Sequence, residues 1–175
     1  MPDTYEFYWK ESIPEIVKKL LDAQSQIWNE KFAVAAKQEG RTRNEILTLA
    51  SIIEAEAPGN DDKLRISGVF YNRLKRNMPL QSDPTVLYAL GLHKERVLYK
   101  DLDVDSPYNT YRNIGLPPGP INSPGVKSIE AALNPEIHDY LYFVAAGDGS
   151  GKINYSRTGQ QHILNVQSFR RERGK

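Results

Sequence analysis

The chain has 175 residues, of which 39% are hydrophobic, so it can bury one good core. Its 23 basic and 22 acidic side chains leave a net charge of +1, which argues against a dedicated nucleic-acid binder. The absence of cysteine excludes disulfides, thiol nucleophiles and thiolate metal sites, and no apolar run is long enough to span a bilayer.

The N-terminal part of the chain predicts an aromatic segment followed by helix. Residues 4–9 alternate and are aromatic, which predicts a short strand or an extended docking segment. Ser12, with a proline two residues later, is a helix start, and the apolar spacing after it predicts a helix reaching Asn29. Residues 32–38 continue this helix or begin a second one, and Gly40 ends it. Because the opening stretch is typical of the middle of a domain, we expect the chain to be part of a longer protein.

Residues 44–57 predict the helix around which the other elements are organised. Apolar side chains recur there at spacings of three and four, which gives the helix one buried stripe. Asn44 can cap its start, and Pro58-Gly59 can end it.

Two glutamates in the last turn of this helix stand beside its apolar stripe. On a helical wheel, Glu56 lies between Leu49 and Ile52, and Glu54 lies on the other side of the stripe. Poor solvation and the negative end of the helix dipole both raise the pKa of such a carboxyl group. A carboxyl group that keeps its proton near neutral pH is what general acid catalysis requires. The alternative is a solvated surface glutamate, which is the more common case.

The next segment predicts a helix that follows the carboxylate-bearing one after a polar loop. Asp61 or Asp62 can cap its start, and its apolar positions continue to Leu74. Gly68 in its middle lowers the stability of the helix by about 1 kcal/mol relative to alanine. A glycine at this position therefore indicates that another segment packs closely against the helix there. One candidate partner for this close approach is the carboxylate-bearing helix.

A short helix and a long loop come next. Asp83-Pro84 starts a helix over residues 85–90, and Gly91 closes it. Residues 99–125 are loop-like, with five prolines and three glycines between positions 107 and 125. Apolar and aromatic side chains are interleaved with these breakers, which favours an ordered, packed loop over disorder.

The C-terminal part predicts two helices separated by a hairpin. Residues 128–133 form a short helix that ends at Asn134-Pro135. Residues 139–146 and 152–156 are hydrophobic strands on either side of a glycine-rich turn. A final helix covers residues 158–172, and its basic end suits the helix dipole without requiring a special role.

These elements predict a single α+β domain over residues 1–175. Helices pack around the central carboxylate-bearing helix, beside a small antiparallel sheet made by the C-terminal hairpin. We also expect the N-terminal segment, residues 4–9, as a candidate third strand of that sheet.

The sequence predicts no metal site and no cofactor. His93, His138 and His162 are scattered, without the clustered spacing that metal ligands usually have. There is no glycine-rich dinucleotide fingerprint, no Walker loop and no nucleophile elbow, and the stretch GDGSGK lacks the strand-to-helix context of a phosphate cradle.

With these motifs excluded, the remaining possibility is chemistry that uses carboxyl groups, with polar and aromatic side chains around them. Five side chains are candidates for lining a groove: Gln81, Asp83, Tyr108, Asn109 and Asn134. Aromatic rings cover the apolar faces of sugars and amides bind their hydroxyls, so this set suits a glycan. Each also has a local structural alternative, since Asp83 can cap a helix, Asn109 can hold a turn and Asn134 can stop a helix.

Several segments together resemble one family, the endolytic murein transglycosylases, also called YceG-like or MltG proteins. The resemblance rests on LTLASIIEAEA, GVFYNRL, LQSDPTVLYALG, YNTYRNIGLPPGPINSPG, AALNP and YLYFVA, in the family's order and over most of the chain. It implies lytic cleavage of nascent peptidoglycan glycan strands by a catalytic domain that needs no cofactor. It also implies a single-pass membrane anchor elsewhere in the protein, a catalytic domain on the cell-wall side, and partners among peptidoglycan synthases and the division or elongation machinery.

The resemblance maps the family's catalytic glutamate onto Glu56, the second glutamate of the pair, and leaves Glu54 to tune or orient it. The family often has lysine between the two and threonine after the second, where this chain has Ala55 and Ala57. The implied mechanism uses Glu56 first as an acid toward the MurNAc–GlcNAc bond and then as a base toward the MurNAc 6-hydroxyl. A 1,6-anhydro ring results, and no second carboxylate is strictly required.

Four residues are expected to contact the sugars: Gln81, Asp83, Tyr108 and Asn109. Two alternatives to a lytic enzyme stay open. One is a glycoside hydrolase with Asp83 or Glu54 as its second carboxylate. The other is a glycan-binding or scaffold module without turnover.

Overall fold

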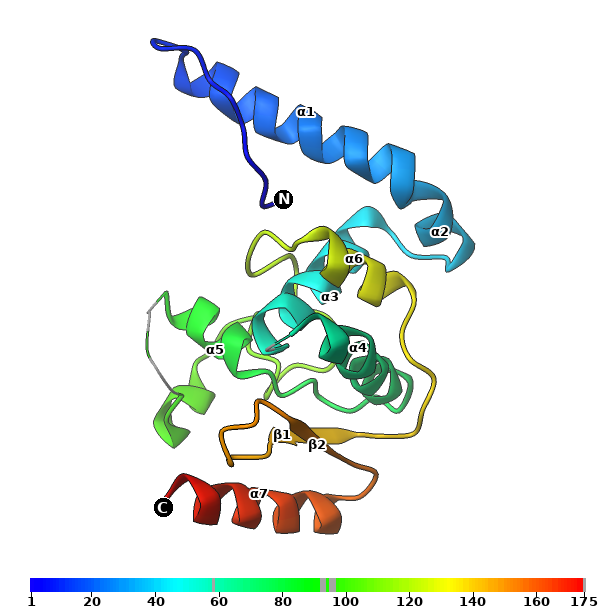
Figure 1. Ribbon diagram of the computed structural model, residues 1–175, viewed down its shortest axis with the longest axis vertical. Helices are drawn as coiled ribbons and strands as arrows, with labels where there is room; N and C mark the ends of the chain where they lie inside the picture. Colours follow the sequence, from blue (N-terminus) through cyan, green and yellow to red (C-terminus); the bar gives the residue numbers. More distant parts are fainter. Residues whose placement is uncertain (58, 92–93, 95–96, 175) are drawn as a thin grey trace.

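The helix that carries Glu54 and Glu56, α3 (Arg43–Glu56), lies at the centre of the molecule (Figure 1). The computed structural model describes residues 1–57, 59–91, 94 and 97–174. Helices α4 (Asn60–Lys75) and α6 (Val126–Leu133) pack directly against α3. Four almost fully buried side chains of α3 form the middle of the core: Ile46, Leu49, Ile52 and Ile53. The predicted α+β fold around a central carboxylate-bearing helix is confirmed.

The start of α3 is fixed by Thr42, two residues before the predicted cap. The Thr42 hydroxyl accepts the Glu45 N–H at 3.2 Å, and the Glu45 carboxylate accepts the Thr42 N–H at 2.8 Å. This reciprocal pair contributes about 1 kcal/mol to the stability of a helix start. The predicted cap, Asn44, instead donates its amide to the Pro118 carbonyl at 3.0 Å. The predicted stop at Pro58 lies outside the described residues.

Helix α4 begins after Gly59, so the predicted caps Asp61 and Asp62 are wrong and lie in its first turn. Gly68 is closely packed, as predicted, but its neighbour is not α3. A Cβ atom at Gly68 would clash with the Glu136 carbonyl oxygen and would lie 2.5 Å from His138 Nε2. The missing side chain therefore lets the segment before the hairpin lie flat on α4.

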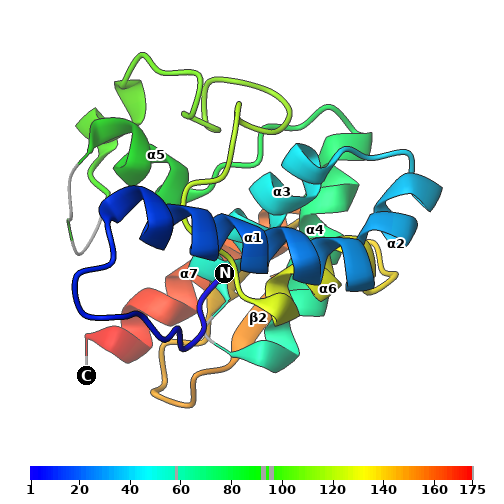
Figure 2. The same ribbon diagram turned by 90° about the horizontal axis from the view of Figure 1, so that it is seen from above.

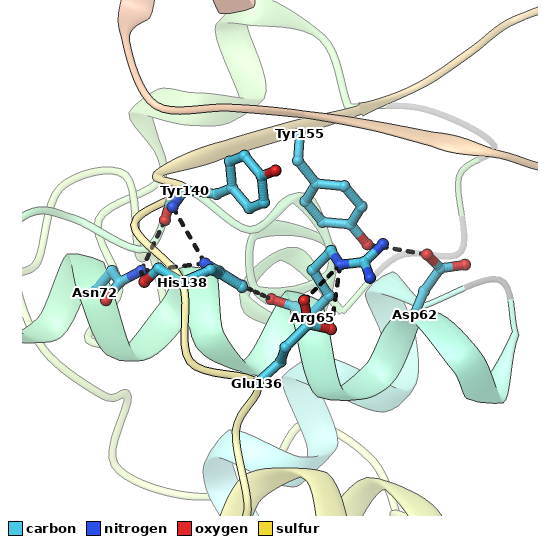
Figure 3. Close-up of polar contacts among 7 residues, drawn as sticks. All are labelled: Asp62, Arg65, Asn72, Glu136, His138, Tyr140 and Tyr155. Carbon is cyan, nitrogen blue, oxygen red and sulfur yellow. Dashed lines mark hydrogen bonds and ion pairs between the residues drawn. The ribbon is translucent and has the colours of Figure 1, made fainter.

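A network of polar contacts holds that segment on α4 (Figure 3). The Asn72 amide donates to the His138 and Tyr140 carbonyls at 2.8 and 3.0 Å. Arg65 pairs with Glu136 at 2.9 Å, and its own carbonyl oxygen lies 2.9 Å from His138 Nε2. These contacts set where the hairpin starts relative to α4.

Helix α5 (Asp83–Leu90) and the loop after it follow the predictions. Gly91 ends α5 with a left-handed φ of 62°, and the 3-10 helix η1 (Tyr99–Asp103) follows. The proline-rich loop is ordered by Asn109, which is fully buried and donates its amide to the Leu102 and Val104 carbonyls, both at 2.9 Å.

The C-terminal hairpin and the last helix close one side of the molecule. Strands β1 (Tyr142–Ala145) and β2 (Ile153–Ser156) pair in antiparallel register, with Phe143 opposite Tyr155. The last helix, α7 (Gly159–Arg173), packs on this sheet on the side away from α3 (Figure 1). The predicted hairpin is confirmed, with the first strand starting three residues later than predicted and the other strand ends within one residue.

The N-terminal segment forms no strand. Residues 1–8 run as an extended chain beside α1 (Ile13–Lys31), where Lys19 Nζ binds the Glu6 carbonyl at 3.0 Å. Across the described ranges the sheet has two strands, β1 and β2, so the expected third strand is wrong. The structure matches the extended conformation of the alternative prediction.

Helix α1 stands apart from the core along most of its length and leads into α2 (Ala33–Gln38) (Figure 1). Seen from above, α1 lies across the body of the molecule (Figure 2). Trp28 near its end is buried, whereas Ile13, Val17 and Leu21 are exposed. None of the described helices combines the length and apolar character needed to cross a membrane.

Replacing Gly68 with alanine should destabilise the fold by about 1–3 kcal/mol, because a new methyl group is forced into a filled contact. Urea unfolding followed by circular dichroism measures the change. Gly159→Ala is the matched control, because a Cβ atom there meets only the Tyr142 hydroxyl at 3.8 Å. Equal stability of Gly68→Ala and Gly159→Ala would contradict the assigned packing.

Candidate functional site

Glu56 stands at the last turn of α3, where two adjoining cavities of about 680 and 410 Å³ meet its side chain. We call these two cavities the Glu56 groove. The hairpin contributes Phe143 and Val144 to both of them. On the other side, α4, the start of α5 and the long loop contribute a polar wall, which consists of Arg73, Gln81, Asp83 and Tyr111. Helix α7 lines the groove as well, so α3 presents its final carboxyl group to a groove built from five other parts of the chain.

The Glu56 carboxyl group is partly buried and accepts one hydrogen bond, from the Ser82 hydroxyl to Oε1 at 2.7 Å. Its pKa is raised to about 7, chiefly by burial and to a smaller extent by the nearby negative charge of Asp83. The Ser82 hydrogen bond and the positive charge of Arg73 act in the opposite direction and are outweighed. Glu56 is therefore protonated in a large fraction of molecules near neutral pH, as its helix position predicts.

Glu54, two residues earlier, has the opposite environment. Its Oε2 accepts three hydrogen bonds, from Lys63 Nζ at 3.0 Å, Ser128 Oγ at 2.5 Å and the Gly125 N–H at 3.1 Å. Burial opposes ionisation of Glu54, but these bonds outweigh it and hold the pKa of this carboxyl below its ordinary value. Glu54 is thus an ionised clamp that fixes the end of α3 to α4 and α6.

Arg73 is a buried cation beneath the groove that sequence reasoning did not single out. Its guanidinium donates to the Leu141 and Leu80 carbonyls, each at 2.7 Å, and lies 5.2 Å from the Tyr142 ring centroid. No ion pair joins it to a carboxylate in the part of the chain that the structure describes. Its charge is therefore available to stabilise an ionised Glu56 across the cavity. A basic residue in a last helical turn resembles an ordinary dipole partner, so its sequence context carries no signal of this position.

The predicted sugar contacts divide into two groups. Gln81 and Asp83 are exposed and line the groove with Glu56. Tyr108 packs against Tyr88, with ring centroids 4.7 Å apart, and Asn109 is buried with its amide bound to loop carbonyls. The buried position of Asn109 leaves no surface for a sugar.

Tyr111, three residues after Tyr108, is the tyrosine of the long loop that lines the groove. Its hydroxyl donates to Asp83 Oδ1 at 2.5 Å, and burial together with that carboxylate raises the pKa of Tyr111. Asp83 follows the helix cap, Ser82, so its carboxylate is not used to cap α5. Asn134 caps α6 by donating to the Glu130 carbonyl at 3.1 Å and is not among the groove residues.

His162 of α7 also lines the groove. From the sequence, His162 is a candidate only as a metal ligand, and its distance from other such residues argues against that role. Its ring stacks on Tyr142, with centroids 5.1 Å apart. Burial, and then the charge of Arg73, lowers the pKa of His162, so the imidazole is neutral. Among the described residues, no three side chains of the metal-binding types are grouped to hold an ion, and His93 lies outside these residues.

Comparison with known proteins identifies the family. The family model described as the YceG-like family matches residues 1–168. This chain belongs to the YceG-like family. A crystal structure of a YceG-like protein from Listeria monocytogenes superposes with a TM-score of 0.87 at 47% identity, over 94% of this chain and 52% of that one.

Two curated relatives carry the name endolytic murein transglycosylase. The relative from Bacillus subtilis is 48% identical over 161 residues, which are 92% of this chain and 44% of the relative. The relative from Streptococcus pneumoniae serotype 2 is 38% identical over 170 residues, 94% of this chain and 30% of the relative. The chain thus spans less than half the length of these relatives.

The raised pKa of Glu56 makes the stability of the chain depend on pH. Between the ordinary value of 4.5 and about 7, the folded state keeps a proton that the unfolded state releases. The free energy of unfolding therefore falls as pH rises through this range, by up to about 3 kcal/mol. Glu56→Gln removes the ionisation, so the variant should be more stable than the wild type at pH 8 and close to it at pH 5.

Urea unfolding at pH 5 and pH 8 measures this difference. Glu30→Gln, a change of an exposed glutamate on α1, serves as the control and should behave like the wild type at both pH values. If the stability of Glu56→Gln relative to the wild type is the same at pH 5 and pH 8, the pKa of Glu56 is not raised in the folded state.

Proposed function

We propose that this chain is the catalytic domain of a lytic endotransglycosylase that cleaves MurNAc–GlcNAc bonds within peptidoglycan strands, with Glu56 as its acid and base. The observation that carries the proposal is a carboxyl group with a pKa of about 7 at the meeting point of two cavities. A general acid works best when its pKa lies near the operating pH. The names of the curated relatives support peptidoglycan as the substrate.

In the first step, protonated Glu56 donates its proton to the glycosidic oxygen as the bond from that oxygen to C1 of MurNAc breaks. Positive charge develops at C1 and the ring oxygen in an oxocarbenium-like state. The Glu56 carboxylate left behind is stabilised by the Ser82 hydrogen bond and by the charge of Arg73. The Asp83 carboxylate, on the same wall, favours the developing positive charge of the sugar.

In the second step, the Glu56 carboxylate accepts the proton of the MurNAc 6-hydroxyl, whose oxygen attacks C1. The new C1–O6 bond closes a 1,6-anhydro ring, no water is consumed, and Glu56 is again protonated. A pKa near neutral suits both steps, because one group must give and take the proton at the same pH. Ser82 holds the carboxyl group in one orientation throughout.

The groove walls suit a glycan strand. Tyr111 and Tyr142 offer aromatic faces for sugar rings, and Gln81 and Asp83 offer polar atoms for hydroxyl and N-acetyl groups. Gln81 is held with a φ of 51°, and its Oε1 lies 3.4 Å from Arg73 Nη1, so its side chain is partly positioned before substrate arrives.

A two-carboxylate hydrolase is the second candidate, favoured by the presence of Asp83 in the same cavity as Glu56. In that mechanism Asp83 activates water or attacks C1 itself, and the product has a reducing end. Glu54 is the weaker second carboxylate, because all its hydrogen-bonding is with Lys63, Ser128 and Gly125.

For the complete protein, we propose a single-pass membrane anchor outside this chain and a catalytic domain on the cell-wall side of the membrane. Peptidoglycan synthases and the division or elongation machinery are the proposed partners. Both proposals rest on the family resemblance and on the substrate implied by the relatives' names.

Mass spectrometry of fragments released from uncrosslinked peptidoglycan tests the mechanism. The wild type should release strands with 1,6-anhydro-MurNAc ends, and Glu56→Gln should lower the rate by about 10²–10⁴-fold because the proton donor is lost. Asp83→Asn should keep the anhydro product at a reduced rate, because it removes only a neighbouring charge.

Other outcomes separate the alternatives. Reducing ends from the wild type, with Asp83→Asn as inactive as Glu56→Gln, would establish the hydrolase. Full activity of Glu56→Gln would overturn the assignment of the acid. Binding of strands without any product would indicate the glycan-binding module.

A further inference from the structure

A third cavity, of about 750 Å³, continues the Glu56 groove toward the end of α7. We call it the arginine cavity, because Arg170 and Arg173 line it. It shares Asp83 and Tyr111 with one part of the groove and Phe169 and Arg173 with the other. A strand bound at Glu56 therefore has this cavity directly beside it.

The two arginines of the cavity place two positive charges at its wall. They are three residues apart on α7, which places them on one face of the helix. Both are exposed, and neither forms an ion pair with a carboxylate in the described ranges, unlike Arg65 and Arg157. The Arg173 guanidinium lies 5.8 Å from the Phe169 ring centroid, so it is held at the cavity wall. The helix dipole explains a basic helix end, but it does not explain why two of its arginines line a cavity.

The acidic side chain that lines this cavity, Asp83, does not neutralise these arginines. Its Oδ1 accepts the Tyr111 hydroxyl, and no contact links it to either guanidinium among the described residues. Two guanidinium groups with ten N–H donors between them are suited to a carboxylate or phosphate.

The remaining wall of the cavity is largely apolar. Val97, Leu98 and Leu102 come from η1 and the residues before it, and Tyr99 beside them is 85% exposed. Figure 1 shows η1 and the C-terminal end of α7 on the same side of the molecule. An apolar wall next to paired guanidinium groups fits a ligand that combines small aliphatic groups with a carboxylate.

We propose that the arginine cavity binds the peptide stem of the peptidoglycan strand, with Arg170 and Arg173 receiving a stem carboxylate. This inference rests on the proposed function of the Glu56 groove. The bare strand carries only the lactyl carboxylate next to each MurNAc ring, whereas a stem attached to that lactyl group adds aliphatic side chains and carboxylates that reach further from the sugar. The domain therefore prefers strands that still carry their stems.

Binding of soluble glycan strands to the Glu56→Gln variant tests this inference without depending on turnover. Strands with intact stems should bind about tenfold more tightly than the same strands after an amidase has removed the stems. Arg170 lines the arginine cavity and neither cavity of the Glu56 groove, so Arg170→Gln in this background should reduce that preference by weakening only the stem-bearing strands. Added salt should reduce the preference too, because exposed charges are screened.

Arg171→Gln is the matched control, because Arg171 is an exposed arginine on the same helix turn that does not line the cavity. It should leave the preference intact. Equal binding of both strands by the Glu56→Gln protein would overturn the inference, as would an equal loss for both strands when Arg170 is changed. A preference for stems in the Glu56→Gln protein, combined with a wild type that releases no anhydro ends, would instead refute the lytic mechanism and leave the stem site standing.

Discussion

The partial burial of one carboxyl group at the end of α3 is the constraint on which the site depends. The hydrogen bond from Ser82 to Glu56 only partly offsets the desolvation of the carboxylate charge. The ionisation of Glu56 therefore costs stability near neutral pH. The fold tolerates this cost because α3 is held in the core by four almost fully buried side chains, which do not depend on the state of Glu56.

The contrast between Glu54 and Glu56 shows how environment separates two like groups. They lie within one turn of the same helix, so the helix dipole affects both. Glu54 meets a lysine, a serine and a backbone N–H, and its pKa falls, whereas Glu56 meets apolar side chains and a neighbouring carboxylate, and its pKa rises. Glu54 is a structural anchor for the last turn of α3, and Glu56 is the proposed proton donor.

Local signals in the sequence predicted the elements well. Apolar spacing located α3 and α4, Gly91 ended α5, and the alternating strands around a glycine-rich turn located the hairpin. Two of the wrong predictions concern which residue caps α3 and whether the N-terminal segment joins the sheet. Thr42 replaced Asn44 as the cap because Glu45 completes its reciprocal hydrogen bonds, and residues 4–9 formed no strand because the sheet lies on the other side of the core.

The site was predictable only in part, because its remaining residues depend on contacts between distant segments. Glu56, Gln81 and Asp83 follow from the sequence and share the groove. Arg73 and His162 lie on helices whose local patterns give no reason to single them out. In the proline-rich loop, Tyr111 rather than Tyr108 faces the groove, and that choice depends on how the buried Asn109 folds the loop.

Direct titration of the Glu56 carboxyl group by carbon-detected NMR is the measurement that bears most closely on this account. Assignment by comparison with Glu56→Gln identifies its resonance, and Glu54 provides an internal contrast in the same spectra. The account predicts a midpoint of about 7 for Glu56, with Glu54 titrating below its ordinary range. A midpoint for Glu56 near 4.5, or a higher midpoint for Glu54 than for Glu56, would contradict it.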